Sequence, residues 1–188
     1  DYYGFSDFTQ GVQPITRLDY RVGGACLFSK HKAAERMLFK QMQQRRIKKR
    51  YMCAVHRRGQ DVGAGKKIVK VKNKLSQKFK AYQDPVHGKQ AETWFVPVSE
   101  GVQQEYGQGG ACALYYALTK TGRRHQVRCH AAGSVGGLVN DDVYVTRLKD
   151  RHRPIGLLAY AIKFKWKGEQ VCITVPDSWV RYWLDSLS

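Results

Sequence analysis

An aspartate flanked by cations and followed by a double glycine is the first group in this chain that could do chemistry. Asp19 lies between Arg17 and Arg21, and Gly23 and Gly24 follow it. Neighbouring guanidinium groups favour the ionised carboxylate, and the glycines permit a tight turn that would hold it in place. Such a carboxylate can act as a nucleophile or as a fixed charge. By itself, however, the pattern is more often a surface ion pair.

A second polar cluster fills residues 121–130, which read Thr-Gly-Arg-Arg-His-Gln-Val-Arg-Cys-His. His125 and His130 could share a metal ion, but residues five apart on a helix point in different directions. A nucleophile pair of Cys129 and His130 fails for a similar reason, because adjacent helical side chains diverge. The preferred interpretation is a basic helix whose N-terminus and side chains meet phosphate.

Charge indicates a polyanionic partner. The chain holds 33 Lys and Arg against 15 Asp and Glu, a formal net charge of +18. Eighteen of the basic residues and two of the acids lie between Lys30 and Lys80, so this stretch alone carries +16. Each phosphate that a cation neutralises releases condensed counterions. The concentration therefore suits nucleic acid better than a solubilising surface, which normally mixes both signs.

The elements that must position these residues fit a single α+β domain over residues 1–188. Hydrophobic residues make up 43% of the chain, enough for one core. Residues 25–28 form a short apolar run that predicts a buried strand. Residues 32–46 predict a helix with Ala34, Leu38 and Met42 on one stripe, and its basic face is either RNA-facing or solvated.

Further strands are predicted over residues 50–55, 67–72, 93–98, 111–119, 155–166 and 171–175. Helices are predicted over residues 124–132 and from an N-cap at Asp177 or Ser178 onward. The Lys-rich stretch 57–90 is predicted as an insertion or a long hairpin. Five scattered cysteines argue against a zinc site and a disulfide scaffold, and no apolar run approaches the roughly 20 residues of a membrane span.

Four segments, in this order, resemble the RluA-type family of pseudouridine synthases. Residues 16–30 match a His-Arg-Leu-Asp segment followed by a turn and an apolar strand, and residues 48–51 match Lys-Lys-x-Tyr. Residues 121–128 match Thr-Gly-Arg-x-His-Gln-Ile-Arg, which is the specific motif of the set. Residues 140–145 weakly echo Gly-Asp-x-x-Tyr-Gly. The resemblance runs from about residue 16 to residue 175.

The resemblance implies the pseudouridine synthase catalytic fold, with a mixed, mostly antiparallel central sheet and flanking short helices. It implies that Asp19 attacks the target uridine, that Tyr51 packs on the base and assists proton transfer, and that Arg128 pairs with the aspartate. Arg17 would brace the same loop as Asp19. Further RNA contacts are expected from Arg21, Lys48, Lys49, Arg123 and Arg124. His125 and Gln126 are expected either to contact RNA or to pack the helix.

The implied reaction, uridine to pseudouridine, is an isomerisation that needs no cofactor and no metal. It needs a base taken out of its stack, an aromatic face to receive it and cations for the backbone. The expected partner is structured RNA, ribosomal RNA first and transfer RNA second, with a ribosomal or pre-ribosomal particle as a further candidate. The expected location is intracellular, with the mitochondrion favoured over the cytoplasm or nucleus.

Departures from the family pattern leave a rival open. Thr16 stands where the family has histidine, and Asn140 and Val145 stand where it has glycines. The strand that usually precedes the Arg-Leu-Asp motif is not found, so we expect the N-terminal part of the domain to be missing. The alternative is a degenerate synthase kept as an RNA-binding component of ribosome assembly. Retention of the three implied catalytic residues favours activity.

Overall fold

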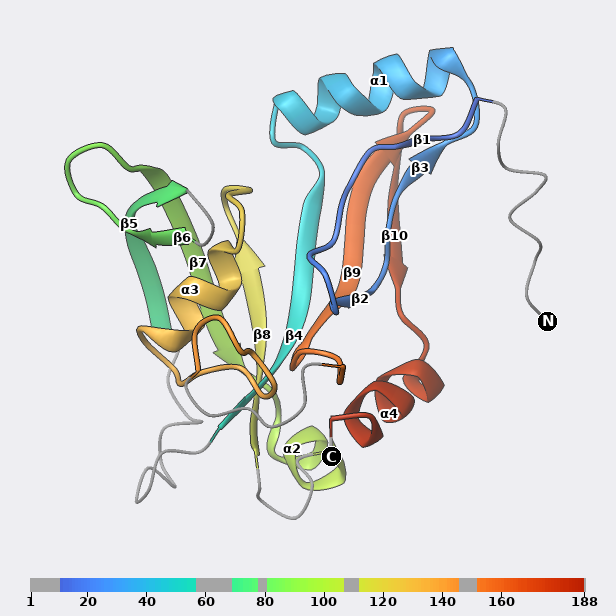
Figure 1. Ribbon diagram of the computed structural model, residues 1–188. Coiled ribbons are helices and arrows are strands. Elements are labelled where there is room, and N and C mark those ends of the chain that lie inside the picture. Colours follow the sequence, from blue (N-terminus) through green and yellow to red (C-terminus); the bar gives the residue numbers. More distant parts are fainter. Residues whose placement is uncertain (1–10, 57–68, 78–80, 107–111, 146–151, 188) are drawn as a thin grey trace.

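An eight-stranded sheet in the described chain runs through the molecule and carries most of the core (Figure 1). The computed structural model describes residues 11–56, 69–77, 81–106, 112–145 and 152–187. Along the main path the strands follow the order β10, β9, β4, β8, β7, β5, β6, each antiparallel to its neighbours. Their bounds, in that order, are Glu169–Thr174, Leu157–Trp166, Lys48–His56, Cys112–Thr119, Lys89–Pro97, Val69–Gln77 and Ala81–Gln83.

One parallel pairing makes the sheet mixed. β2, Gly23–Gly24, runs parallel to β9, with Gly24 opposite Ala159. A side chain at Gly24 would place its Cβ 2.5 Å from the Ala159 carbonyl oxygen, and φ there is +113°. Glycine is therefore required for this close approach. The predicted α+β class, with a mixed, mostly antiparallel sheet flanked by short helices, is confirmed.

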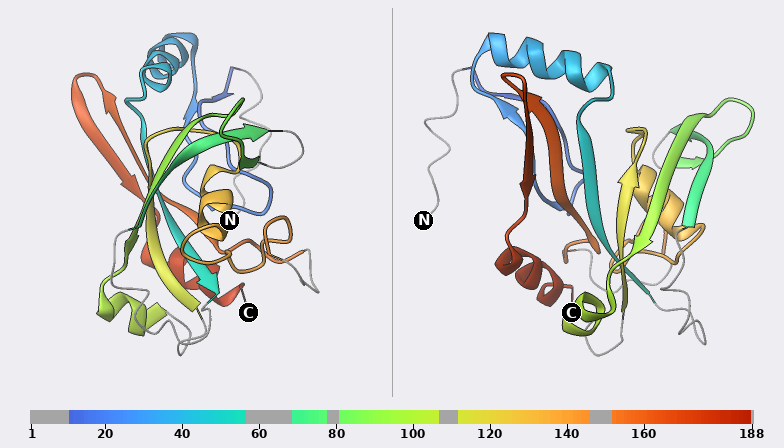
Figure 2. Two further views of the ribbon diagram at one scale, coloured as in Figure 1. Left: turned by 90° about the vertical axis from the view of Figure 1, so that its left-hand side faces the viewer. Right: turned by 180° about the vertical axis from the view of Figure 1, so that it is seen from behind.

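Helices flank both faces of the sheet. Strand β4 contributes to the core on each face, because successive side chains of a strand point to opposite faces. The helices of the described chain are α1 (Lys32–Gln43), α2 (Glu100–Tyr106), α3 (Gln126–Ala132) and α4 (Asp177–Asp185). Met52 and Ala54 share a core cluster with α4, whereas Cys53 and Val55 share another with α3. Figure 2 shows α1 across one end of the sheet and α4 beyond the other end.

The helix predictions agree with the structure where hydrophobic periodicity was strong. The helix predicted over residues 32–46 ends at Gln43, and the strand predicted over residues 50–55 lies inside β4. The N-cap predicted at Asp177 or Ser178 is wrong, because Pro176 caps α4 without a side-chain hydrogen bond. Asp177 instead lies in the first turn, where its carboxylate faces the positive end of the helix dipole.

The prediction of a buried strand over residues 25–28 is wrong. The chain is divided there between two short pairings, β2 against β9 and β3, Phe28–Ser29, against β1, Gln13–Pro14. Phe28 is 52% exposed. The positive-φ turn at Gly24 redirects the chain, so that the apolar run leaves the sheet instead of extending it.

Part of the Lys-rich stretch 57–90 belongs to the main sheet. β5 pairs with β7 from Val69 opposite Phe95 to Leu75 opposite Lys89, and it forms an antiparallel hairpin with β6. Residues 57–68 and 78–80 lie outside the described residues, so the insertion stays a prediction. None of the described helices is long and apolar enough to cross a membrane.

Burial of His130 on α3 predicts a specific sensitivity to acid. The side chain is fully buried, its Nδ1 lies 2.9 Å from the Thr93 hydroxyl, and burial lowers its pKa from 6.5 to about 4. The unfolded chain takes up this proton first, so the stabilisation is present above pH 6.5 and is lost as the pH falls towards 4. The free energy of unfolding should fall by roughly 3 kcal/mol across this window.

Urea unfolding at a series of pH values measures this loss, and a His130→Gln variant supplies the control. The variant is expected to unfold more easily at pH 7 but to show a flatter dependence on pH. Some slope should persist, because burial also lowers the pKa of His125. Equal slopes for the two proteins would rule out His130 as the source.

Candidate active site

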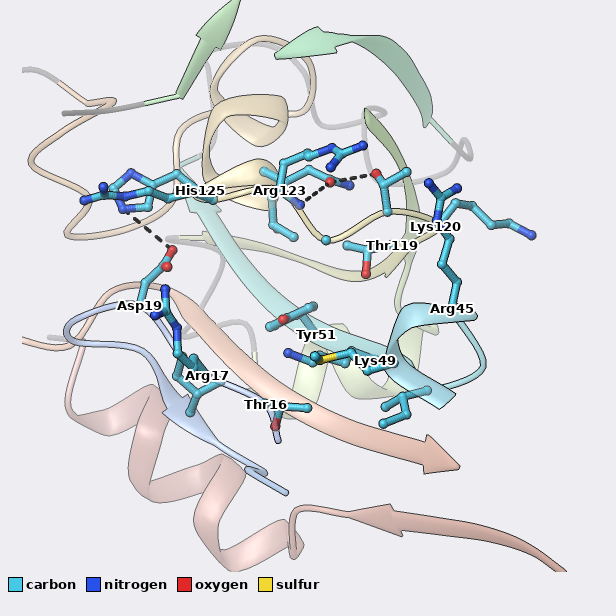
Figure 3. Close-up of a pocket in the computed structure, with 18 of the residues that line it drawn as sticks. Thr16, Arg17, Asp19, Arg45, Lys49, Tyr51, Thr119, Lys120, Arg123 and His125 are labelled. Carbon is cyan, nitrogen blue, oxygen red and sulfur yellow. Dashed lines mark hydrogen bonds and ion pairs between the residues drawn. The ribbon is translucent and has the colours of Figure 1, made fainter. Parts of the chain in front are cut away.

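A cleft of about 1170 Å³ opens between the Asp19 loop, the C-terminal end of α1, β4 and the start of α3 (Figure 3). Among the described residues that line it, Asp19 is the one acid. The lining cations are Arg17, Arg45, Lys48, Lys49, Lys89, Lys120, Arg123, Arg124 and Arg128. Such a cleft suits a ligand rich in phosphate, and its volume exceeds the ~300–1,000 Å³ usual for small-molecule pockets.

Asp19 lies in the loop between β1 and β2, in a turn closed by the Val22 N–H, which donates to the Asp19 carbonyl at 3.1 Å. Its Oδ2 lies 3.8 Å from Nη1 of Arg128 and 3.9 Å from Nε2 of His125. The side chain is 30% exposed. No hydrogen bond from another described residue reaches the carboxylate. It therefore faces two nitrogen groups while remaining open to a ligand in the cleft.

Arg128 is held by a buried acid that the sequence analysis did not assign. Its Nε and Nη2 donate to the two carboxylate oxygens of Asp141, at 2.8 Å and 2.6 Å. The Arg128 side chain is 4% exposed and that of Asp141 is fully buried. Burial alone would lower the pKa of Arg128, but its hydrogen bonds and ion pair with Asp141 raise it. Only Nη1 is left to face Asp19.

His125 links Arg128 to the β5–β6 hairpin. Its Nε2 lies 3.2 Å from Nη1 of Arg128, and a guanidinium only donates, so this ring nitrogen accepts. Nδ1 therefore carries the proton and faces the Tyr144 hydroxyl at 3.3 Å. That hydroxyl donates to the Ala81 carbonyl at 2.9 Å and accepts from the Ala81 N–H at 2.8 Å. Burial, and then the Arg128 charge, lowers the pKa of His125, which favours the neutral ring.

Tyr51 presents its ring to the cleft from β4, opposite Ala117 of β8. Burial, reinforced by the Asp19 carboxylate, raises the pKa of the phenol, so the hydroxyl keeps its proton near neutral pH. Lys49 lies two residues earlier on the same side of the strand, and burial lowers the pKa of its ammonium group although Asp19 opposes the shift. The site thus combines an aromatic face, a carboxylate and cations (Figure 3).

The predicted RNA contacts divide into two groups. Arg17, Lys48, Lys49, Arg123, Arg124 and His125 all line the cleft. Arg21 does not line it, and its RNA contact stays a prediction that the position of its side chain does not favour. Its guanidinium is turned into the protein, where it meets Asp142 at 2.5 Å and the Arg153 carbonyl at 3.1 Å, and the side chain is 7% exposed. Arg21 therefore anchors the Asp19 loop.

Gln126 lines the cleft, but its amide is already satisfied by the protein. Its carbonyl accepts from the Thr121 hydroxyl at 2.7 Å and from the Arg123 N–H at 3.0 Å. Its NH₂ donates to the Glu92 carbonyl and to the Thr93 hydroxyl, both at 2.9 Å. The residue is 3% exposed. It ties the loop before α3 to β7, which favours the packing role of the two expected for this residue.

The departures from the family pattern are accommodated locally. Thr16 is buried, and its hydroxyl accepts from the Leu27 N–H at 3.0 Å, which joins the two arms of the Asp19 loop. Asn140 has φ of +58°, and asparagine is among the residues that best tolerate the left-handed region where the family has glycine. Val145 packs over Gly137, where any Cβ would come within 2.2 Å of it.

Asp141 and Tyr144 are the site residues that sequence reasoning missed. Both lie in residues 140–145, which matched the family only weakly because Asn140 and Val145 replace glycines. The aspartate and tyrosine of that pattern are nevertheless present at the right spacing. The polar residues of a partly eroded motif were the available signal.

The chain belongs to the RNA pseudouridylate synthase family, and the model of that family matches residues 2–133. It is 29% identical over 139 residues to tRNA pseudouridine synthase C of Haemophilus ducreyi, covering 72% of this chain and 56% of that protein. It is 28% identical over 173 residues to ribosomal large subunit pseudouridine synthase C of Pasteurella multocida, covering 88% of this chain and 51% of that protein. The chain thus spans about half the length of these curated relatives.

The fold is shared with a solved human structure, RNA pseudouridylate synthase domain containing 1. The two superpose with a TM-score of 0.74 at 20% sequence identity, over 95% of this chain and 74% of the human chain. At this identity the likeness concerns the fold alone.

Proposed function

We propose that this chain binds structured RNA in the cleft and isomerises a uridine to pseudouridine, with Asp19 as the nucleophile. The observation that carries the proposal is the position of Asp19, the single described acid in a cationic cleft, open to a ligand and 3.8 Å from Arg128. A carboxylate held beside a fixed cation is oriented for attack without a strong bond that the ligand must first break.

The reaction balances without an oxidant, a reductant or a metal. The Asp19 carboxylate attacks ribose C1′ of the target uridine as the bond between C1′ and base N1 breaks. The base then turns, and C5 joins C1′ as the bond between C1′ and Asp19 breaks, which restores the free carboxylate. C5 loses a proton and N1 gains one, so that substrate and product have the same composition. Tyr51 receives the extruded base on its ring, and its raised pKa makes it a neutral hydrogen-bond donor before RNA arrives.

Ribosomal RNA is the preferred target class and transfer RNA the second. One observation supports this order: ribosomal large subunit pseudouridine synthase C of Pasteurella multocida matches 88% of this chain, whereas tRNA pseudouridine synthase C of Haemophilus ducreyi matches 72%. Association with a ribosomal particle and a mitochondrial location are further parts of the proposal.

Mapping pseudouridine in cells tests the function and the target together. Cells that lack the protein would be complemented with the wild type or with Asp19→Ala, and ribosomal and transfer RNA from mitochondrial and cytosolic fractions would be compared. We expect one or a few sites to depend on the wild type and to vanish with Asp19→Ala. If no site depends on Asp19 while RNA still binds, the protein is the non-catalytic RNA-binding factor instead.

A further inference from the structure

Helix α1 ends in a capping turn whose left-handed position holds an unusual residue type. The Arg46 N–H donates to the Gln41 carbonyl at 2.8 Å, and the Arg45 N–H donates to the Met42 carbonyl at 3.0 Å. These two bonds define a Schellman motif, in which the residue after the cap adopts the left-handed conformation. That residue is Arg45, with φ of +55°.

Glycine is the usual residue at this position, because a side chain in the left-handed region is strained. Asparagine is the common substitute, and arginine has no local hydrogen bond to offset the strain. Strained non-glycine residues that persist in a fold gather at functional sites.

The side chain of Arg45 lines the cleft, on the side away from the reactive carboxylate. Figure 3 shows Arg45 and Lys120 across Tyr51 from Asp19 and His125. The side chain of Arg45 makes no hydrogen bond or ion pair with any other residue that the structure describes. Lys120 stands 5.8 Å from the centre of the Trp94 ring, a contact that leaves its ammonium group able to meet an anion.

Lys48 completes the cationic group, and the spacing along β4 separates it from the target base. Lys48 is exposed, lines the cleft and lies three residues before Tyr51. At about 3.3 Å per residue of strand, roughly 10 Å divides the two positions. A phosphate held there belongs to a neighbour of the nucleotide whose base meets Tyr51.

The wall beside Arg45 is apolar. Phe39 and Met42 of α1 line the same cleft, and Met42 is 39% exposed although its type favours burial. An aromatic ring and a thioether next to a guanidinium can receive the face of an unpaired base, while the cation binds its phosphate.

We propose that Arg45, Lys48 and Lys120, with Phe39 and Met42, form a second nucleotide subsite that holds the single-stranded RNA next to the target uridine. The subsite rests on the proposed binding of RNA in the cleft and adds where the flanking strand lies. Arg45 is the central member, since the fold accepts backbone strain to keep a cation at that position.

The strain provides a test, because one substitution should preserve or raise the melting temperature while it lowers the affinity for RNA. Arg45→Gly removes the side chain and relieves the left-handed backbone, so its melting temperature should equal or exceed that of the wild type. Its affinity for a fluorescein-labelled RNA stem-loop with a loop of uridines, measured by anisotropy, should fall about five- to tenfold. The slope of log affinity against log salt should become shallower by about 0.7, as for one lost phosphate contact on single-stranded RNA.

Arg46→Gly is the matched control, because it removes the same charge one residue further along from a side chain that does not line the cleft. It should change affinity by less than about twofold, and Arg45→Lys should recover most of the binding. Equal affinities for wild type and Arg45→Gly, or equal losses in the two glycine variants, would overturn the subsite while leaving RNA binding intact. A wild-type protein that does not bind the stem-loop at all would instead remove the proposed function on which the subsite rests.

Discussion

Replacing Arg128 with methionine should lower the free energy of unfolding by about 3–5 kcal/mol, a large share of the stability of a domain this size. The reason is Asp141, which is fully buried and has two of its hydrogen bonds from the guanidinium. Without Arg128 the carboxylate keeps the Val143 N–H at 3.2 Å but loses its cation. Urea unfolding, with unchanged dependence on urea concentration, measures the loss.

The double variant Arg128→Met/Asp141→Leu separates stability from activity. Removing both charges removes the unpaired buried group, so much of the lost stability should return. Neither the single nor the double variant is expected to form pseudouridine, because Nη1 of Arg128 is also the group that faces Asp19. A single Arg128→Met variant that unfolds within 1 kcal/mol of the wild type would mean that this pair is not the buried anchor described above.

Asp19→Asn should abolish turnover while leaving the fold and RNA binding intact. The amide has nearly the same shape but lacks the nucleophilic charge, and we expect the rate to fall by a factor on the order of 10³ or more. Affinity should stay the same or rise, because the substitution removes the one described acid from the cationic cleft lining. Stability should change little, since the carboxylate is 30% exposed and its ionic partner Arg128 is 3.8 Å away.

Single-turnover release of tritium from C5 of the target uridine, with anisotropy on the same RNA, measures both quantities. Asp185→Asn is the matched control, because it removes the same charge from an exposed position on α4. A variant that loses RNA affinity in step with its rate would indicate that Asp19 positions the loop and is not the nucleophile.

The parts of the fold that could be predicted are those in which one face of an element meets the core. Helix α1 showed its stripe because Ala34 and Leu38 are buried, and β4 showed alternation because Met52 and Cys53 face opposite clusters. The ends of these elements were less certain, since hydrogen bonds and backbone turns fix them. The left-handed turn at Arg45 ends α1, and the sequence has no glycine at this position that would have predicted the turn.

Apart from the N-cap of α4, the differences between expectation and structure came from contacts between distant parts of the chain. The run at residues 25–28 has the composition of a strand, but its pairing depends on Ala159, far away in sequence. Arg21 was expected to contact RNA, but its guanidinium pairs with Asp142 inside the protein. The amide of Gln126 is held by groups on β7. Arginine and glutamine serve as ligand contacts or as internal braces, and residue type alone does not distinguish the two.

For the site, an ordered set of motifs carried more information than any local pattern. Asp19, Tyr51 and Arg128 come from three separate elements and meet in one cleft. Asp141 and Tyr144 were missed because glycines around them had been replaced. Backbone conformation explains why the segment still works, since Asn140 keeps the left-handed turn that a glycine would make.

The parallel pairing of β2 with β9 has a consequence for how the protein matures. Residues 2–133, the part that matches the family, contain Asp19, Tyr51 and Arg128 but not the strand Leu157–Trp166 against which the Asp19 loop is docked. During synthesis the loop is made more than a hundred residues before the strand with which it pairs. The candidate site therefore cannot form before β9 has been made, and a chain released before β9 would carry the residues of the site without the site.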